Sequence, residues 1–288
     1  MFIKEESEID SSVNFVNKID EKNAIECRFV HRDNSDYCIF YLSSQTGCRK
    51  SCRMCYLTAT GQNKSRDCTI DELKDQFDIL HFHYEEYKRH NPCLSGRIHV
   101  DFMARGEPLD SSVIVNSNHI LFDYIKKREP EALFLISTIM PDSYSGRHLY
   151  RDFYSHKNSV KIYYSLYSSD FRFRKKWLPM SMDPRDALRE LTDWSKVSGD
   201  RTKIHQALIS GQNDSEEDAQ SICDLIHQSG LYPDFNIVRY NAFSYKYGEE
   251  SKNIDDYCDV LRSRFPSSTI IVKPRVGFDV NASCGMFV

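Results

Sequence analysis

Three cysteines within eight residues are the part of this sequence best suited to chemistry. Cys48, Cys52 and Cys55 follow the pattern Cys-x-x-x-Cys-x-x-Cys, and the next cysteine, Cys68, comes thirteen residues later. Thiolates are the usual ligands of iron-sulfur clusters, so three of them on one loop predict a cluster with one iron open to another ligand. A structural zinc site normally has four protein ligands. The alternatives are therefore a zinc knuckle that borrows Cys68 or a histidine, and a chance group in a cysteine-rich chain.

Length and composition predict one globular domain in a reducing compartment. The chain has 288 residues, of which 40% are hydrophobic and 28% charged, which suits a large core under a charged surface. Ten irregularly spaced cysteines, a polar amino terminus and the lack of a long apolar run argue against secretion and membrane insertion. We expect a cytoplasmic protein with free thiols.

The formal net charge of −4 gives no overall sign of nucleic-acid binding, but two segments are basic. The first spans residues 49–66, contains no acidic residue, and predicts an electropositive face beside the cysteines; its cations are Arg49, Lys50, Arg53, Lys64 and Arg66. The second, Phe171 to Trp177, mixes cations with aromatic rings, as in sites for phosphates and unstacked bases. Either segment is equally well explained as a solvated face whose aromatic rings turn inward.

Apolar runs that read as strands alternate with amphipathic stretches that read as helices. Capping pairs predict helix starts at Thr69 with Glu72 and at Asn213 with Glu216. This alternation predicts an α/β fold of parallel βαβ units, and about six units predict an open or partial (β/α)6 barrel. We expect an amino-terminal lead over residues 1–36 and one catalytic domain over residues 37–288. The expected strands are 38–42, 97–103, 132–137, 160–166, 202–209, 235–240 and 269–273, and the expected helices are 69–90, 113–128, 184–196, 213–230 and 254–265.

Polar residues follow several of the expected strands at their carboxyl ends, where a barrel of this kind carries its functional groups. A single polar residue there is more often a turn or a cap than a ligand. Because several of them meet at one rim, we expect a site there. Besides the cysteine loop, the candidates are Gly106, Glu107, Ser137, Thr138, Ser165 and Asn241.

These motifs together resemble the radical S-adenosylmethionine (SAM) enzymes, and among them the RlmN/Cfr type of RNA adenine methyltransferase. The similarity covers the chain from about Ile25 to its end. It rests on six motifs in the same order as in that family, which are residues 43–55, 102–109, 136–138 and 165–166, Asn241 and residues 282–285.

The resemblance implies a radical SAM barrel, a [4Fe-4S] cluster and SAM. Cys48, Cys52 and Cys55 would hold the cluster, and its fourth iron would bind the amino and carboxylate groups of SAM. Glu107 in the Gly106-Glu107 motif would accept the SAM ammonium group. The remaining cofactor contacts implied by the resemblance are Ser137, Thr138, Ser165 and Asn241.

The resemblance also implies catalytic residues and partners. Cys284 would carry a methyl group that is then transferred to an adenine carbon of RNA, and Glu26 would take a proton from that adenine. The substrate would be ribosomal RNA, transfer RNA or a small RNA. A protein such as flavodoxin would supply electrons.

The chain departs from the family pattern at three places. Tyr41 stands where the family has a second essential cysteine, which resolves the methyl-carrying cysteine by forming a disulfide. Cys38 or Cys27 could replace that thiol, or Tyr41 could place a phenol near the radical in a different reaction. Tyr167 replaces a family histidine, and the amino-terminal RNA-gripping domain of the family is missing from this short form.

Two other functions are compatible with these departures. One is a radical SAM enzyme that abstracts hydrogen from a small molecule, peptide or nucleotide without transferring a methyl group. The other is a zinc-stabilised RNA-binding module without catalytic activity.

Overall fold

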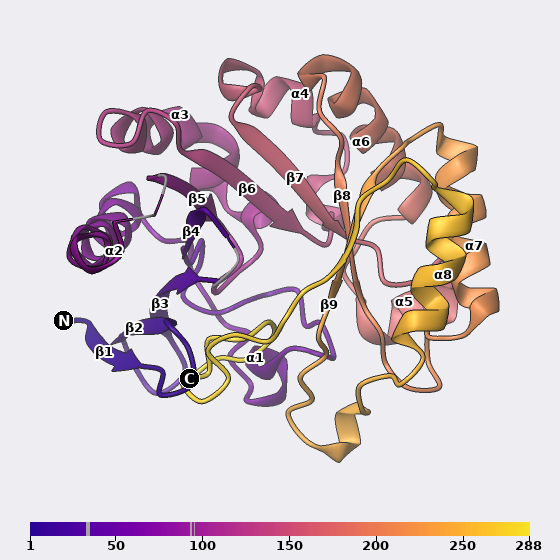
Figure 1. Cartoon of the computed structure of the whole chain (residues 1–288), viewed down its shortest axis with the longest axis horizontal. Helices are drawn as coiled ribbons and strands as arrows, with labels where there is room; N and C mark the ends of the chain where they lie inside the picture. The colour runs from indigo at the N-terminus through magenta and orange to yellow at the C-terminus, as the bar shows by residue number, and fades with distance from the viewer. Residues whose placement is uncertain (33–34, 93, 95) are drawn as a thin grey trace.

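The fold is built on one ten-stranded sheet whose strands lie side by side in chain order (Figure 1). The computed structural model describes residues 1–32, 35–92, 94 and 96–288. Strands β1 to β3 are antiparallel to one another, and β3 is antiparallel to β4. From β4 onward every pair of neighbours is parallel, as the sequence predicts. The strands are β1 (Ile3–Glu6), β2 (Val13–Lys18), β3 (Ala24–His31), β4 (Tyr37–Tyr41), β5 (Arg97–Asp101), β6 (Leu133–Thr138), β7 (Val160–Ser165), β8 (Lys203–Ala207), β9 (Asp234–Val238) and β10 (Ile270–Val272).

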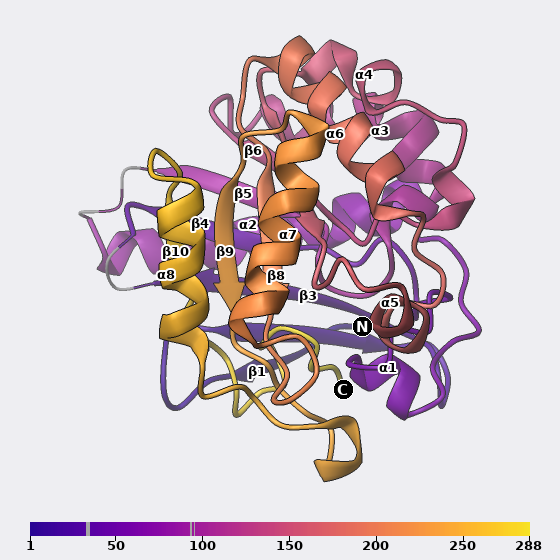
Figure 2. The same cartoon turned by 90° about the vertical axis from the view of Figure 1, so that its right-hand side faces the viewer.

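The sheet curves like part of a barrel and remains open, since no pairing among the described residues joins β1 to β10. Helices that connect the parallel strands cover its outer side (Figures 1 and 2). This agrees with the predicted α/β fold with a partial barrel. The helices are α1 (Tyr56–Ala59), α2 (Ile70–His90), α3 (Ser112–Lys126), α4 (Leu149–Asp152), α5 (Phe171–Trp177), α6 (Pro184–Ser198), α7 (Glu216–Ser229) and α8 (Ile254–Arg264), with short 3-10 turns at Pro108–Asp110, Asp142–Tyr144, Tyr154–His156 and Tyr245–Tyr247.

The two faces of β4 serve different purposes. Cys38 and Phe40 belong to the apolar core between the sheet and its helices. Tyr37, Ile39 and Tyr41 point the other way and line a cavity inside the curved sheet. This division follows from the period of two along a strand, and it recurs on the other parallel strands.

Helix α2 begins as the sequence predicts, whereas α7 begins differently. The hydroxyl of Thr69 accepts from the amide of Glu72, and the Glu72 carboxylate accepts from the amide of Thr69. For α7 the capping box is Ser215 with Asp218, so the prediction of Asn213 with Glu216 was wrong. The buried Asn213 side chain instead accepts from the amide of Ile209 and donates to the carbonyls of Ala207 and Tyr167, so it links the preceding loop to the loop after β7.

The amino-terminal lead joins the same sheet as the parallel strands, because β3 pairs with β4. The carboxyl-terminal segment after β10 crosses the open side of the sheet and returns to β2, where Asn14 donates to the carbonyl of Val280 at 3.1 Å (Figure 1). The two ends of the chain therefore meet across the opening of the barrel. The division at residue 36 stays a prediction. None of the described helices combines the length and apolar character needed to cross a bilayer.

We predict that Thr69→Ala lowers the free energy of unfolding by about 1 kcal/mol, because the helix loses its amino-terminal cap. Chemical denaturation measures this change. Thr69→Ser keeps the hydroxyl and should stay within a few tenths of a kcal/mol of the parent. Equal losses in the two variants would show that the cap hydroxyl contributes nothing.

Candidate active site

The cysteine loop lies between β4 and α2, at the carboxyl end of β4. The amide of Cys48 donates to the carbonyl of Gln62 at 3.1 Å, and the amide of Cys55 donates to the carbonyl of Cys52 at 3.1 Å. Gly47 is needed here, because a Cβ at this position would stand 2.5 Å from the Gln62 carbonyl oxygen. The loop is thus held closely enough to orient all three half-buried thiols.

The three thiols converge on one place. Burial raises the pKa of Cys52, and the neighbouring Cys48 and Cys55 raise it further. Burial also raises the pKa of Cys48 to about 12, again with a contribution from Cys55. Thiols that disfavour one another's charge in this way are well placed to share a cationic metal centre, which removes the penalty when it binds.

The loop offers three thiols but not the four protein ligands of a structural zinc site. Cys68, the proposed fourth zinc ligand, is fully buried in the apolar core instead. Three thiols on one loop suit an iron-sulfur cluster with one iron open to another ligand.

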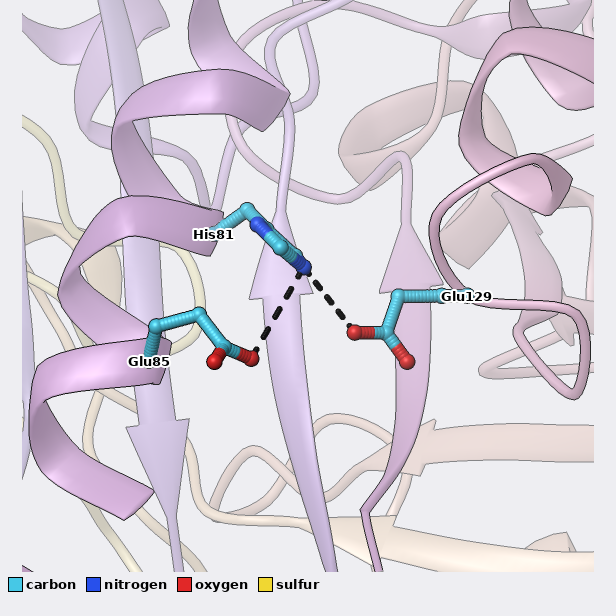
Figure 3. A group of neighbouring side chains, drawn as sticks. All are labelled: His81, Glu85 and Glu129. Atoms are coloured by element: carbon cyan, nitrogen blue, oxygen red, sulfur yellow. Dashed lines mark hydrogen bonds and ion pairs between the residues drawn. The ribbon is translucent and has the colours of Figure 1, made fainter. Parts of the chain in front are cut away.

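One group of possible metal ligands in the described part of the chain has all its ligand atoms within 4.8 Å of one another, but it lies elsewhere. It consists of His81 and Glu85 on α2 and Glu129 just beyond α3 (Figure 3). His81 Nε2 lies 2.9 Å from Glu129 Oε1 and 4.0 Å from Glu85 Oε1. Because Glu85 is half exposed and His81 already pairs with Glu129, an ordinary ion pair accounts for this group.

Glu107 lies beside the cysteine loop, following β5. Its Oε1 accepts from the amide of Leu109 at 3.1 Å, and its Oε2 accepts from the amide of Ile139 at 3.0 Å. Burial raises the pKa of Glu107 to about 7. Gly106 has φ of +100°, and a Cβ there would stand 2.6 Å from Ser44 Oγ, so the chain can turn this closely only at glycine.

The polar residues that end β6 and β7 lie on the same rim. Ser137 Oγ donates to Asp101 Oδ1 at 2.8 Å, and Thr138 Oγ1 accepts from the amide of Met140 at 2.8 Å. Thr138 also hydrogen-bonds with Glu107. Ser165 hydrogen-bonds with the buried Tyr167, and Cys284, Cys52 and Cys55 all act on the pKa of this tyrosine, so it lies near the cysteines. The structure thus brings these predicted residues together.

The carboxyl-terminal tail brings Cys284 to this rim. Asn241 Nδ2 donates to the carbonyl of Cys284 at 2.9 Å and to Ser283 Oγ at 3.1 Å, so this predicted cofactor contact holds the tail. The amide of Tyr56, next to Cys55, donates to the carbonyl of Gly285 at 3.0 Å. Burial and then Cys55 raise the pKa of Cys284 to about 11. Cys284 therefore lies beside the cysteine loop.

A buried ion network fixes the end of the tail. Glu26 Oε1 accepts from Arg105 Nε at 2.7 Å and from the amide of Val288 at 3.1 Å, while its Oε2 accepts from Arg28 Nη2 at 2.8 Å. The same guanidinium groups donate onward, Arg28 to the carbonyl of Met286 at 2.7 Å and Arg105 to that of Val288 at 2.5 Å. Burial alone would raise the pKa of Glu26, but Arg28 and Arg105 outweigh it and the pKa is lowered.

Glu26 is therefore a fully buried, charged group that holds the tail. Both of its oxygens are engaged, and a lowered pKa makes it a weaker proton acceptor. Sequence reasoning missed Arg28 although it stands two residues from Glu26 on β3. It missed Arg105 because the partners of Arg105, Glu26 and Val288, lie far away along the chain. The one signal in the sequence for Arg105 is its position directly before the Gly106-Glu107 motif.

Two tyrosines, Tyr41 and Tyr167, lie near Cys284. Tyr41 lines the cavity and hydrogen-bonds with Arg32, and the thiol of Cys284 contributes to the raised pKa of both Tyr41 and Tyr167. Cys38 and Cys27 belong to the outer apolar core, on the opposite face of their strands. Neither of these thiols points toward Cys284.

Three of the five cations in the basic segment around the cysteines are paired with carboxylates. Arg49 and the buried Lys50 both pair with Asp110, and Arg49 also pairs with Asp67. Arg66 pairs with Glu72 through both carboxylate oxygens. These acidic partners lie outside the segment and reduce its positive charge, so the predicted electropositive face stays a prediction.

The second basic segment forms α5, and its rings turn mostly inward. Phe173 and Trp177 are buried and stack against each other with ring centres 5.8 Å apart. Arg174 is also buried and donates to the carbonyl of Leu166 at 2.5 Å. Phe171 alone among these rings is exposed, so the solvated-face interpretation is correct for most of α5.

Comparison with known proteins adds sequence and fold relatives. No protein-family model matches the chain. The ribosomal RNA large subunit methyltransferase Cfr from Clostridium botulinum is 26% identical over 263 residues, covering 85% of this chain and 68% of Cfr. The probable dual-specificity RNA methyltransferase RlmN from Malacoplasma penetrans is 27% identical over 279 residues, covering 96% of this chain and 74% of RlmN. A solved radical SAM methyltransferase from Sphaerobacter thermophilus matches with a TM-score of 0.79 at 19% identity, covering 99% of this chain and 80% of that one.

The chain shares the fold of the solved radical SAM methyltransferase. The sequence relatives named Cfr and RlmN, together with the ordered motifs, support a radical SAM enzyme of the RlmN/Cfr type. This confirms the resemblance on which the sequence predictions rest.

We predict that Glu26→Gln loosens the carboxyl-terminal tail, because two buried guanidinium groups lose their counter-charge. Removing one partner of a buried ion pair costs about 3–5 kcal/mol of stability. Hydrogen-deuterium exchange of residues 282–288 should therefore become much faster, and denaturation should show the loss of stability. Asp186→Asn, which breaks an exposed ion pair with Arg189, is the control and should cost under about 1 kcal/mol. Unchanged tail protection in Glu26→Gln would contradict this role.

Proposed function

We propose that this chain is a radical SAM methyltransferase that methylates an adenine carbon of RNA through a methylated Cys284. The observation that carries this proposal is the tail, which holds Cys284 between the cysteine loop and the cavity inside the sheet. The sequence relatives, whose names describe them as RNA methyltransferases, support the same reaction and substrate class. Reduced thiols suit action in the cytoplasm.

Cys48, Cys52 and Cys55 would hold the [4Fe-4S] cluster, because three thiolates on one loop leave one iron open to another ligand. The bound cluster and SAM supply a 5′-deoxyadenosyl radical and the methyl group. Glu107 suits the SAM ammonium group, because it is a buried carboxylate that receives hydrogen bonds but has no strong counter-charge. Ser137, Thr138 and Ser165 lie on the same rim as further cofactor contacts.

The chain's own residues then position the methyl carrier. Asn241 and the amide of Tyr56 hold the backbone on both sides of the Cys284 thiol, so the sulfur stays beside the cavity. Burial and then Cys55 raise its pKa to about 11. The resting thiol therefore holds its proton and must release it to a base as the sulfur accepts a methyl group. Cys284 is the one thiol among the described residues that lines the cavity.

Asp101 is better placed than Glu26 to accept a proton from the substrate. It lines the cavity, and burial raises its pKa to about 7. A base with a pKa near the working pH is the most effective one. The groups that face Asp101 are Ser137, Arg32, Tyr41, Tyr163 and Cys284.

We predict that turnover rises with pH through about 7, because only ionised Asp101 can accept the proton. The rate of RNA methylation between pH 6 and 9 measures this. Asp101→Asn should lower the rate at least about a hundredfold and remove the rise, since general base catalysis contributes 10²–10⁴. Ser137→Ala removes the hydrogen bond but keeps the carboxylate, and should shift the rise to higher pH. A pH profile that is the same in Asp101→Asn as in the parent would contradict this assignment.

Product release does not involve Cys38 or Cys27, because both thiols face the outer apolar core. We predict that Cys38→Ala and Cys27→Ala each keep at least about half of the parental turnover, with stability losses of the order of 1 kcal/mol from the small cavities created. Quantifying methylated RNA over several turnovers measures this. Loss of turnover with RNA trapped on Cys284 would instead identify the substituted residue as the resolving thiol.

One anaerobic experiment tests the proposed function. The protein is reconstituted with iron and sulfide and given SAM, ribosomal RNA or transfer RNA, and either a chemical reductant or flavodoxin as the electron donor. Methyl transfer yields S-adenosylhomocysteine, 5′-deoxyadenosine and methylated adenine, and Cys284→Ala should abolish the methylated base while the control Cys223→Ala, in α7, does not. Production of 5′-deoxyadenosine alone would support hydrogen abstraction without methyl transfer, which the phenol of Tyr41 favours. A colourless, zinc-filled protein would contradict both.

A further inference from the structure

The cavity inside the curved sheet has a volume of about 210 Å³ and carries polar groups that the proposed reaction does not use. One end lies beneath Cys284, next to Tyr41 and Asp101. Away from that end the strands contribute rings. Tyr37 and His99 stack with centres 4.0 Å apart, and Tyr163 meets His205 edge to face at 4.9 Å.

Six lysine and arginine side chains line this cavity, and three of them are of interest here, namely Arg32 after β3, Lys203 at the start of β8 and Lys273 after β10. None of these three forms an ion pair with a carboxylate in the described part of the chain. Arg32 Nε is buried and has no hydrogen-bond partner, although the guanidinium reaches Tyr41. Lys203 Nζ lies 5.5 Å above the ring centre of Tyr163.

The other cations of the lining already have partners. Arg28 pairs with Glu26, and both Arg239 and Arg275 pair with Glu250. Arg32, Lys203 and Lys273 therefore form a distinct set, which we call the inner cation cluster.

The members of the inner cation cluster repel one another. Burial, Arg32 and Lys203 together lower the pKa of Lys273 to about 8. Burial lowers the pKa of His205 to about 3, with further contributions from Lys273, Lys203 and Arg32. Asp101 is the one described carboxylate in the lining, and its own pKa is raised to about 7. Among the described residues, Asp101 faces Arg32 and Asp234 on β9 faces Lys203, so fewer carboxylates than cations stand at this cluster. A bound anion would compensate the remaining positive charge.

The SAM sulfonium is itself cationic, so the inner cation cluster does not suit the cofactor. Phosphate groups match both the charge and the hydrogen-bond donors of lysine and arginine. The neighbouring tyrosine and histidine rings offer flat surfaces on which a base can stack.

We infer that Arg32, Lys203 and Lys273 bind a phosphate group of the substrate nucleotide and thereby direct its base toward Cys284. This inference rests on the proposed function for the identity of the base. Either an RNA or a free nucleotide can supply this phosphate. In both cases the substrate binds at the inner face of the sheet.

Isothermal titration of the reconstituted enzyme tests the inference, with S-adenosylhomocysteine added first to fill the cofactor site. The probes are adenosine, adenosine 5′-monophosphate and inorganic phosphate. The parent should bind adenosine 5′-monophosphate at least about tenfold more tightly than adenosine, since hydrogen bonds to charged groups are among the strong ones. The double variant Lys203→Gln with Lys273→Gln should reduce that preference to near one. The double variant with arginine at both positions should keep it.

Lys196→Gln is the matched control, because Lys196 is exposed on α6 and pairs only with Asp193 among the described residues. It should keep the full preference. Equal binding of adenosine and its monophosphate by the parent, a preference that survives the double glutamine variant, or no binding of any phosphate probe would each overturn the inference.

A short adenosine-containing RNA distinguishes the two sources of phosphate. Displacement of bound adenosine 5′-monophosphate by this RNA assigns the site to RNA, and lack of displacement assigns it to the free nucleotide. Methylated RNA and S-adenosylhomocysteine remain the separate test of the proposed function. The two measurements are independent. The enzyme can prefer adenosine 5′-monophosphate and yet fail to methylate RNA, or it can methylate RNA without showing this preference.

Discussion

The buried carboxylate of Glu26 is the interaction on which the geometry of the site depends. Two guanidinium groups, from β3 and from the loop after β5, could not be buried together without it. Once paired, Arg28 and Arg105 have donors left over, and the backbone of the tail accepts them. Apolar packing alone would allow the tail to shift, whereas directional charge-assisted hydrogen bonds fix its position. The place of Cys284 beside the cysteine loop follows from this anchor.

The two faces of the curved sheet have different roles: one carries the apolar core that stabilises the fold, and the other carries the polar side chains of the cavity. The outward side chains pack against the helices and form a continuous apolar core. The inward side chains are free to be polar, because the sheet does not close tightly and the tail covers its open side. Residues one position apart, such as Phe40 and Tyr41, therefore have unrelated roles. Tyr41 can replace a cysteine of the family without disturbing the core.

Local patterns predicted most of the fold and part of the site. The cap at Thr69, the alternation of strands and helices, and the cysteine spacing depend on neighbours in the chain. The sequence could not predict pairings between distant segments. Asp110 neutralises Arg49 and Lys50 from 60 or more residues away, and Glu26 contacts Val288 at the far end of the chain. The sequence pattern around Asn213 matches a helix cap, so Asn213 was predicted to cap α7. In the structure its side chain forms three buried hydrogen bonds with other backbone groups instead.

The central claim is that Cys284 carries the methyl group, and peptide mass spectrometry tests it most directly. Anaerobically reconstituted protein is incubated with SAM alone, digested, and compared with a Cys48→Ala variant that cannot hold the cluster. The account predicts a Cys284 peptide heavier by one methyl group in place of a hydrogen, and an unmodified peptide in the variant. An unmodified Cys284 in protein that nonetheless methylates RNA would contradict the account.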